Sequence, residues 1–524
     1  MKTLILKVSK AMAFGALLFS ANWAHAQLNG TSYTINSGAA TSCVGASSTG
    51  TNFQTWSDFV TYFNTYGITS TSKVTVITDE VTTGTSSLTL TQNSSKPTSS
   101  TVRLIIEGNS KKLSTAATYE VLGLNGIDYL TIRNLTVENA NTSYYQSCIR
   151  MYAGADYNSV QSCTLQLSAL STGITSGGAY FAFASSASSL TSTSTTHNGS
   201  YDTINNCLMR TTNSNSPGPT YAIVDQQGSS YYSSTPSNNT FSNNTIQNFY
   251  YYAIRNYYTN GEQFLNNDIS RANSSTNNCY SSIMMVYTYY TYSTNRSTSY
   301  TGNKFHDLPC LNGSSSTYSS STVYGMYGYY NYGNSTNYFT VTNNTWQNIH
   351  CGSTNYITNF YYAYYSNISG NKVIKWNSYS TGAYFYGFYM YYMYSDLKFN
   401  NNLVRDCFTK YYTYFVYDYY GDKKQYYGNK IVNNITGDGS TGYTYVFYQY
   451  YPSSGYTNEC NNNVIDSNTF GSYTYGFYQY YWNGTFNNNI ITNNRIYNAN
   501  YSSYYGYIYA TALQYFFNFQ CNNN

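Results

Sequence analysis

Hydrophobic and polar residues alternate in a unit that recurs along most of the chain. One part of the unit is a Tyr-x-Tyr-Tyr segment, whose copies begin at Tyr287, Tyr327, Tyr362, Tyr389, Tyr417, Tyr448 and Tyr478. The other part is a block of the form apolar-x-(Asn/Gly)-Asn-x-apolar. Its fourth residue, here called the anchor asparagine, occurs at Asn244, Asn267, Asn303, Asn344, Asn371, Asn402, Asn429, Asn463 and Asn489. Repetition at this period predicts a solenoid.

Apolar residues flank each anchor asparagine at positions that can share a core. Around Asn402, we expect Phe399 and Val404 to point inward, whereas the asparagine itself falls in a turn. Asparagine suits a turn because it tolerates a left-handed backbone, and amide side chains that stack from coil to coil can hydrogen-bond as a ladder. We therefore predict that the anchors form a structural ladder and not a metal or ligand site.

Residues 27–72 do not follow the repeat and are predicted to form an N-terminal cap. Thr55 is a suitable N-cap, and the apolar residues Trp56, Phe59, Val60 and Phe63 lie on one stripe of a helix over about residues 55–66. Such a helix would cover the open end of the first coil. Short β-prone runs split by Ser, Thr and Gly turns follow it. The prediction is an all-β chain in which residues 73–524 form a right-handed parallel β-helix.

Both ends of the chain carry further information. Residues 1–26 resemble a secretory signal peptide, with Lys2, Lys7 and Lys10 ahead of a short apolar core and an Ala24-His25-Ala26 cleavage site. The end, Cys521-Asn522-Asn523-Asn524, matches Cys460-Asn461-Asn462-Asn463 and stops within a block, so we expect a fragment truncated at its C-terminus. No other stretch has the roughly 20 apolar residues that cross a bilayer. We expect a secreted or cell-surface protein without a membrane span after signal cleavage.

Composition narrows the classes of partner. Only 8% of the residues are charged and the net charge is +4, which provides no field for a polyanion, so nucleic acid is not expected as a partner. Aromatic residues make up 19% of the chain, with 70 tyrosines, which favours a packed β structure over disorder. No acidic cluster of the kind that binds metals is present, and we expect neither metal nor cofactor. The sequence leaves the oligomeric state open.

Two pairs of cysteines occupy equivalent positions in neighbouring units. Cys163 and Cys207 both stand in the anchor position, and Cys310 and Cys351 both fall seven residues after an anchor. If the units stack, each pair forms either a disulfide between coils or an unbonded apolar ladder. An exported protein permits the bond.

The Tyr-x-Tyr-Tyr segment supplies the candidate binding residues. The residue before each segment is apolar, so a period of two turns the first and third residues of the segment outward and the second, which includes Asp418, inward. The outward set is Tyr327, Tyr329, Tyr362, Tyr364, Tyr389, Tyr391, Tyr417, Tyr419, Tyr448, Tyr450, Tyr478 and Tyr480. Stacked phenols combine an apolar ring with a polar rim and suit a polysaccharide or a cell-surface glycan. Alternatively, the stacked aromatic pairs stabilise the sheet and nothing more.

The chain resembles right-handed parallel β-helix proteins of the pectin-lyase-like superfamily. The cap, the Leu130–Val137 strand and the Asn blocks carry this likeness. The segment from Asn52 to Ile77, with its Val74-Thr75-Val76 strand, is most similar to large secreted surface proteins of Bacteroidetes. The resemblance implies the fold and an extracellular location. It leaves function open, because β-helices include lyases, hydrolases, adhesins and stalks.

Pectin-cleaving members of that superfamily carry acidic triads or an Asp/Lys/Arg cluster on one sheet, and their motifs are absent here. The densest charge lies between residues 396 and 430, where stacking could bring Arg405, Asp418 and Lys423 together as a base and a carboxylate-holding cation. The alternative is a solvated cluster of ion pairs. The first hypothesis is a non-catalytic protein for adhesion or glycan binding; a polysaccharide lyase or glycoside hydrolase and a passive stalk are the alternatives.

Overall fold

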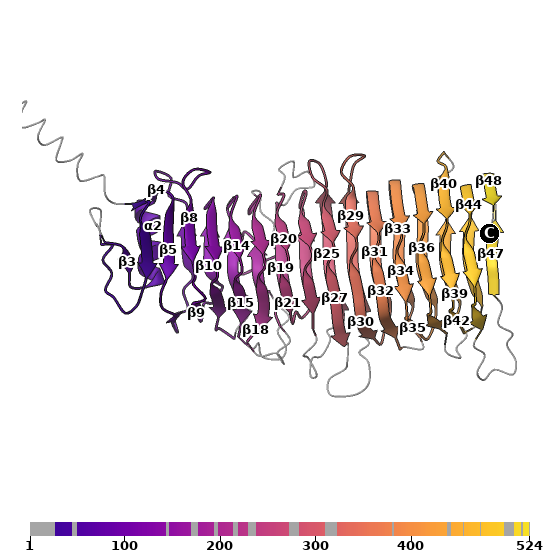
Figure 1. The fold of residues 1–524 in the computed structure, drawn as a ribbon, viewed down its shortest axis with the longest axis horizontal. Coiled ribbons are helices and arrows are strands. Elements are labelled where there is room, and N and C mark those ends of the chain that lie inside the picture. The colour runs from indigo at the N-terminus through magenta and orange to yellow at the C-terminus, as the bar shows by residue number, and fades with distance from the viewer. Residues whose placement is uncertain are drawn as a thin grey trace, which may run out of the picture.

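In the computed structural model, short parallel strands stack side by side into a long solenoid, with one helix at its N-terminal end (Figure 1). The structure describes residues 27–44, 50–142, 146–168, 177–192, 197–212, 218–228, 237–271, 282–309, 322–379, 382–437, 442–453, 455–471, 473–496, 508–514 and 517–522. Strands that follow one another in the chain diverge into separate stacks, and each strand pairs in parallel with its counterparts in neighbouring coils. This arrangement confirms the predicted all-β fold, a right-handed parallel β-helix.

Each coil contributes strands to three stacks, here called the first, second and third stack. The first contains β7 (Leu88–Thr91), β10 (Glu120–Asn125), β13 (Ser147–Tyr152), β16 (Ala179–Phe183), β19 (Tyr221–Gln226), β22 (Tyr252–Tyr257), β25 (Ser282–Tyr292), β28 (Thr322–Tyr332), β31 (Asn355–Ser369), β33 (Phe385–Asn400), β36 (Thr413–Tyr427), β39 (Thr444–Tyr450), β43 (Thr474–Tyr480) and β47 (Ile508–Gln514). The second contains β2 (Ser32–Ile35), β5 (Ser72–Val76), β8 (Leu104–Glu107), β11 (Leu130–Arg133), β14 (Ser159–Gln161), β17 (Thr203–Asn205), β20 (Thr240–Ser242), β23 (Gln263–Leu265), β26 (Ser299–Thr301), β29 (Phe339–Thr342), β40 (Asn458–Asn461), β44 (Asn483–Asn487) and β48 (Phe517–Asn522). Strands β31, β33 and β36 run through the corner and serve both stacks.

The third stack follows the anchor turn. It contains β6 (Glu80–Val81), β9 (Lys112–Thr115), β12 (Thr136–Asn139), β15 (Thr164–Leu167), β18 (Leu208–Thr211), β21 (Thr245–Gln247), β24 (Asp268–Ser270), β27 (Lys304–Pro309), β30 (Thr345–Cys351) and β32 (Lys372–Ser378). Beyond β32 it divides into β34 (Leu403–Arg405), β35 (Phe408–Thr409), β37 (Lys430–Val432), β38 (Ile435–Thr436), β41 (Val464–Asp466), β42 (Thr469–Phe470), β45 (Ile490–Thr492) and β46 (Arg495–Ile496).

Helix α2 (Trp56–Tyr66) covers the N-terminal end of the solenoid. Thr55 and Asp58 form a reciprocal capping box at its start, and Gly67, with φ 72°, ends it. Trp56, Phe59 and Phe63 are fully buried. Around the helix, β1 (Leu28–Asn29) pairs with β4 (Ile68–Ser70), and β3 (Asn52–Phe53) pairs with β2. The helix therefore supplies apolar cover where the first coil has no preceding coil.

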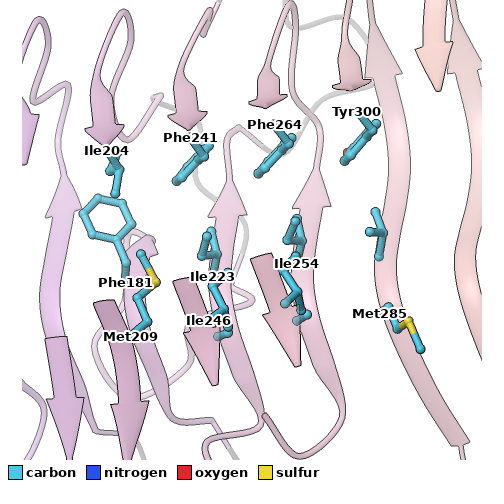
Figure 2. Close-up of a cluster of buried hydrophobic side chains, with 14 of the residues drawn as sticks. Phe181, Ile204, Met209, Ile223, Phe241, Ile246, Ile254, Phe264, Met285 and Tyr300 are labelled. Atoms are coloured by element: carbon cyan, nitrogen blue, oxygen red, sulfur yellow. The ribbon is translucent and has the colours of Figure 1, made fainter. Parts of the chain in front are cut away.

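The core consists of files of side chains that repeat from coil to coil. Ile204, Phe241, Phe264 and Tyr300 are register partners in the second stack and form one such file (Figure 2). The Phe241 and Phe264 rings lie 4.8 Å apart at 2°, and Phe264 and Tyr300 lie 5.0 Å apart at 3°. Parallel strands place equivalent residues directly above one another, so a repeated sequence position becomes a continuous row of contacts.

The anchor asparagines form a continuous buried hydrogen-bond ladder. Asn371 shows the pattern: its Nδ2 donates to Val341 O at 2.8 Å and to Asn402 Oδ1 at 3.0 Å. Its Oδ1 accepts from both N and Nδ2 of Asn344, each at 3.1 Å. The amide thereby uses both of its hydrogens and both acceptor positions. Equivalent bonds join Asn244, Asn267, Asn303, Asn344, Asn371, Asn402, Asn429, Asn463 and Asn489.

The left-handed residue of this turn is the one before the anchor. Asn343 has φ 56°, Gly370 has φ 69° and Asn401 has φ 56°, whereas none of the anchors has positive φ. We expected the anchor itself to adopt that conformation, and this detail is wrong. The preceding position holds Asn or Gly because these residues enter the left-handed region at low cost, which frees the anchor side chain to point inward.

Two further rows of stacked turn residues escaped the sequence analysis. In the last coils, Asn434, Asn468 and Asn494 repeat the ladder five residues after the anchors, with Nδ2 to Oδ1 distances of 3.0 and 2.9 Å. Ahead of the second stack, Asp202 Oδ1 accepts from Asn158 N and Asn239 Oδ1 accepts from Asp202 N. Asp202 therefore occupies a position that is asparagine in the two neighbouring coils.

The cysteines are free thiols in the described part of the chain. Cys163 and Cys207 lie in the same buried file and neither forms a disulfide, so of the two alternatives the structure has the unbonded apolar ladder and not the Cys163–Cys207 bond. Neighbouring parallel strands hold their side chains side by side about 4.8 Å apart, whereas a disulfide brings the two Cβ atoms to about 3.8 Å. The predicted Cys310–Cys351 bond involves Cys310, which lies outside the described residues.

This geometry predicts how the thiols react. Cys148, Cys407 and Cys460 are fully buried, and burial raises the pKa of each thiol, whereas Cys521 is exposed. Thiolates and not thiols attack alkylating reagents. We expect iodoacetamide to label Cys521 in the native protein and to reach the buried cysteines only after unfolding, as followed by peptide mass spectrometry. Equal labelling rates would contradict the buried files.

Candidate functional site: a tyrosine-lined face

The first stack turns a repeated set of tyrosines toward solvent. The apolar residue before each segment is fully buried at Phe388, Val416, Phe447 and Phe477. The second residue of the segment is buried as well, at Met390, Asp418, Gln449 and Gln479. The tyrosines on either side of this buried residue are partly exposed. Strand alternation therefore fixes the outward direction of the phenols.

These phenols stack into columns along the solenoid. Tyr389, Tyr417, Tyr448 and Tyr478 form one column with ring centroids 4.7, 5.0 and 5.1 Å apart and ring planes within 5°. Tyr391, Tyr419, Tyr450 and Tyr480 form a second column with spacings of 4.8, 5.4 and 4.6 Å. Tyr327 and Tyr329 occupy the same two register positions two coils earlier, where they stack on Tyr287 and Tyr289; in the coil between, these positions hold Asn359 and Tyr361.

Two of the predicted binding residues belong to other columns. Tyr362 stacks between Tyr330 and Tyr392, and Tyr364 stacks between Tyr332 and Tyr394. In β31 the register partner of Tyr327 is Asn359, and that of Tyr329 is Tyr361. The predicted alignment of this coil was therefore three residues out of register, although Tyr362 and Tyr364 remain partly exposed.

A further column lies three residues ahead of the segments and was missed. It contains Tyr324, Tyr356, Tyr386, Tyr414, Tyr445, Tyr475 and Tyr509, with centroid spacings of 4.9 to 5.2 Å. Two consecutive buried residues, such as Gly387 and Phe388, stand between it and the next column. Because every coil buries the same two consecutive residues, a tyrosine at a spacing of three returns to the same side of the sheet, and the strands stay in register. The repeated Tyr-x-x-Tyr spacing was the available signal.

The columns pack against one another and form one continuous surface, here called the tyrosine face. Tyr386 meets Tyr389 edge to face at 5.1 Å and 81°, and Tyr389 lies parallel to Tyr391 at 6.0 Å and 9°. Tyr391 then meets Tyr392 edge to face at 4.6 Å and 89°. Offset parallel and edge-to-face contacts are both favourable for aromatic rings, so the face is rigid.

The outermost column has an unusual backbone. Tyr330 and Tyr362 have φ 56°, and Tyr451 and Tyr481 have φ 46° and 56°. A non-glycine residue in this region costs of order 1 kcal/mol or more. Left-handed tyrosines are not confined to this column, because Tyr129, Tyr157 and Tyr201 in earlier coils have φ 51°, 58° and 60°.

Burial keeps the phenols protonated. It raises the pKa of Tyr386 and Tyr445 to about 12, with neighbouring phenols adding to the effect. Burial, together with the phenols next to each ring, also raises the pKa of Tyr389, Tyr417 and Tyr448. The tyrosine face is thus uncharged near neutral pH and offers hydroxyl groups that can donate and accept hydrogen bonds.

The raised pKa values predict alkaline destabilisation. A tyrosine in the unfolded chain titrates near 10, so these phenols contribute stability below about pH 10 that is lost as the pH rises through their folded pKa values. We expect the ultraviolet absorbance of phenolate to appear at higher pH in the native protein than in urea, together with loss of β circular dichroism. Titration curves that coincide in the two states would contradict this prediction.

The three residues of the alternative catalytic cluster do not lie together. Arg405 ends β34 in the third stack, is half-exposed and contacts Asp406 at 3.1 Å. Asp418 is fully buried in the interior and contacts Lys424 at 2.7 Å. Lys423 is a register partner of Asp396 on the surface of β36. Because strand alternation directs these side chains to different sides of the sheets, the predicted cluster of Arg405, Asp418 and Lys423 is wrong.

Other ionisable groups form local pairs. His306 contacts Asp268 and Asp307, each at 2.6 Å, and His197 contacts Asp156 at 3.1 Å. Across the described ranges, no group of three or more His, Cys, Asp or Glu side chains has the arrangement of a metal site. No described helix has both the length and the hydrophobicity of a membrane span. The tyrosine face is therefore the feature that offers a repeated and specific surface.

Comparisons with known proteins do not identify a family or a function for the chain. No protein-family model matches the chain, and no curated protein matches it. Among solved structures it is similar to a crystal structure of the Dettilon tailspike protein, with a TM-score of 0.24 and 9% sequence identity. The match covers 83% of this chain and 64% of the tailspike chain. The description of the fold therefore stands on the strand pairings of this chain.

Proposed function

We propose that this protein is a non-catalytic, exported β-helix protein that binds polysaccharide or cell-surface glycan chains through the tyrosine face. It would act in adhesion at a cell surface, as the secreted pectin-lyase-like proteins of Bacteroidetes that its sequence resembles suggest. The proposal takes residues 1–26 as the export signal, and this segment lies outside the described residues.

The carrying observation is the long, uncharged surface of ordered phenols. Sugar rings present apolar C–H faces edged by hydroxyl groups, and phenols match both properties. The rings are already stacked at 4.6 to 5.4 Å, so binding would not have to order flexible side chains, which is a large cost in most interfaces.

The test removes one exposed column and leaves its supports in place. Tyr391, Tyr419, Tyr450 and Tyr480 are changed together to serine, and affinity is measured by calorimetry for ligands that a glycan array identifies. Four lost ring contacts of about 0.7 kcal/mol each predict a loss of about 100-fold. Affinity that stays within about threefold of the parent value would remove the face from the proposal.

A matched control comes from the chain itself. Tyr129, Tyr157 and Tyr201 form another stack, with centroids 4.9 Å apart and planes within 3°, in earlier coils away from the tyrosine face. Changing these three residues to serine should leave glycan affinity unchanged, because they lie outside the face. Equal losses in both variants would indicate that stacked tyrosines are adhesive in general. A blank glycan array would favour the passive stalk.

Binding is also expected to be insensitive to pH. The phenols of the tyrosine face keep their protons well above neutrality because burial raises their pKa values. Affinity for a neutral glycan should therefore be constant between about pH 6 and pH 9. A steep change within this interval, measured by the same calorimetry, would point to a binding group other than the phenols.

A further inference from the structure

The interior of one coil contains an oppositely charged pair that its neighbours lack. Strand β36 runs through the corner between the first and second stacks and carries Asp418 before the corner and Lys424 after it. Both side chains are completely buried. In the preceding coil their register partners are Met390 and Leu397. The fold therefore does not require ionisable groups at these two positions.

The reacting atoms of the pair are in close contact. Lys424 Nζ lies 2.7 Å from Asp418 Oδ2, and the Tyr426 hydroxyl donates a hydrogen bond to the same oxygen at 2.5 Å. Asp418 Oδ1 is buried with no hydrogen-bond partner, and Nζ, despite its contact, is not aligned for a hydrogen bond. A buried ion pair normally offsets its desolvation by satisfying its remaining donors and acceptors. This pair leaves them unsatisfied.

The surroundings favour uncharged groups at both positions. Burial lowers the pKa of the Lys424 ammonium, and burial raises the pKa of the Asp418 carboxyl, while their mutual attraction opposes both shifts. A free amine is the nucleophilic form of lysine, and a neutral carboxyl is the form that an amine attacks. The corner of β36 also holds the two groups in fixed proximity, which can replace much of the entropic cost of bringing reactants together.

We propose that Asp418 and Lys424 are joined by an amide bond, an intramolecular isopeptide cross-link between Cγ and Nζ. Nζ attacks Cγ, the Cγ–Nζ bond forms and the Cγ–Oδ2 bond breaks. Two of the three ammonium hydrogens pass to Oδ2, which leaves as water, and the third stays on the amide nitrogen. The step needs no oxidant or other reactant. It replaces two buried ionisable groups by one neutral amide, and the dry interior opposes the reverse hydrolysis.

Tyr426 is the positioning residue for this step. Its hydroxyl group contacts the oxygen that leaves, so it can stabilise negative charge on Oδ2 while the carbon–oxygen bond breaks. Its register partner in the preceding coil is Phe399, which shows that the file accepts a ring without the hydroxyl. Tyr426→Phe should therefore fold and should slow the linkage by at least tenfold, as measured by the linked fraction over time after refolding.

Mass spectrometry of the full chain tests the proposal directly. We expect the purified protein to be lighter than the calculated mass of its mature chain by the mass of one water molecule. Trypsin cannot cleave after an acylated lysine, so peptides 411–423 and 424–430 should appear as one branched species joined through Asp418 and Lys424. A native protein of full mass that yields 411–423 and 425–430 as separate peptides, which cleavage after a free Lys424 produces, would overturn the proposal, because both groups are present and folded in that sample.

Two variants locate the bond. The double variant Asp418→Met and Lys424→Leu reproduces the residues of the preceding coil, so it should fold and show the full mass. Lys423→Gln changes the neighbouring surface lysine and should keep the loss of water. If the loss persists in the double variant, it arises elsewhere and the assignment to Asp418 and Lys424 is wrong.

Discussion

Replacing Asn371 by alanine is expected to destabilise the centre of the solenoid by about 4 kcal/mol. The substitution removes the acceptor of Asn344 N and of one hydrogen of Asn344 Nδ2, which keeps its bond to Tyr300 O, and it removes the side-chain donor to Val341 O. Each unsatisfied buried group costs about 1–3 kcal/mol, and water cannot replace the lost amide because Asn371 is fully buried. The effect exceeds that of a surface hydrogen bond because the ladder is interrupted on both sides.

Hydrogen exchange in the native state measures this cost locally, which suits a solenoid whose coils need not unfold together. The amide of Asn344 should exchange much faster in the variant, whereas amides near helix α2 should change little. Asn343→Gly is the matched control, because it alters the exposed left-handed residue of the same turn and keeps its backbone accessible. Unchanged protection at Asn344 in Asn371→Ala would show that the ladder contributes little stability.

Asp202→Asn should have the opposite effect and stabilise the protein at neutral pH by about 1–3 kcal/mol. Asp202 is fully buried in a row with Asn158 and Asn239, and its Oδ2 has no hydrogen-bond partner. An asparagine at this position would supply an Nδ2 donor, as the anchors do, and would remove a carboxyl whose ionisation burial opposes. Oδ1 could still accept the Asn158 N–H.

The pH dependence of the stability difference between the two proteins would identify the buried Asp202 carboxyl as its cause. Burial raises the pKa of Asp202 well above the value near 3.9 of an unfolded aspartate. Its contribution to stability is therefore fully present below that value and is lost as the pH rises through the folded pKa. The advantage of Asp202→Asn in urea unfolding should grow from about pH 4 to pH 8. A constant difference between the two proteins would contradict this explanation.

Asp466→Asn provides the control for that series. Hydrogen bonds from Thr492 and Asn493 lower the pKa of the partly exposed Asp466 carboxyl. Its contribution is present above the unfolded value and is lost as the pH falls, so the variant should lose a little stability near neutral pH. Opposite signs for the same chemical substitution would separate the effect of burial from a general effect of charge.

The sequence predicted the features that depend on repetition. A fixed spacing of apolar residues and asparagines implies stacking, and the nine anchors could be identified because each block contains the same short pattern. The extra row at Asn434, Asn468 and Asn494 was missed because it occurs only in the last coils, where the third stack divides. Asp202 was missed because one acidic residue stands where its neighbours have asparagine.

Register and direction could not be predicted equally well. In β31, the run Phe360-Tyr361-Tyr362-Ala363-Tyr364 allows more than one alignment with the repeat, and burial of Phe360 and Ala363 determines which one forms. The cluster of Arg405, Asp418 and Lys423 looked compact in sequence, but strand alternation separates it. Cys163 and Cys207 were placed in the correct file, although parallel side chains do not turn toward one another as a disulfide requires.

The ladder has a consequence for how the chain accommodates inserted segments. Successive anchors are separated by 23 to 41 residues, yet each amide meets the next within 3.1 Å. Every coil is thus re-aligned by its own asparagine, whatever the length of the excursion before it. Foreign peptides placed between the third and first stacks should therefore be carried as side branches, and errors of phase should not accumulate along the rod.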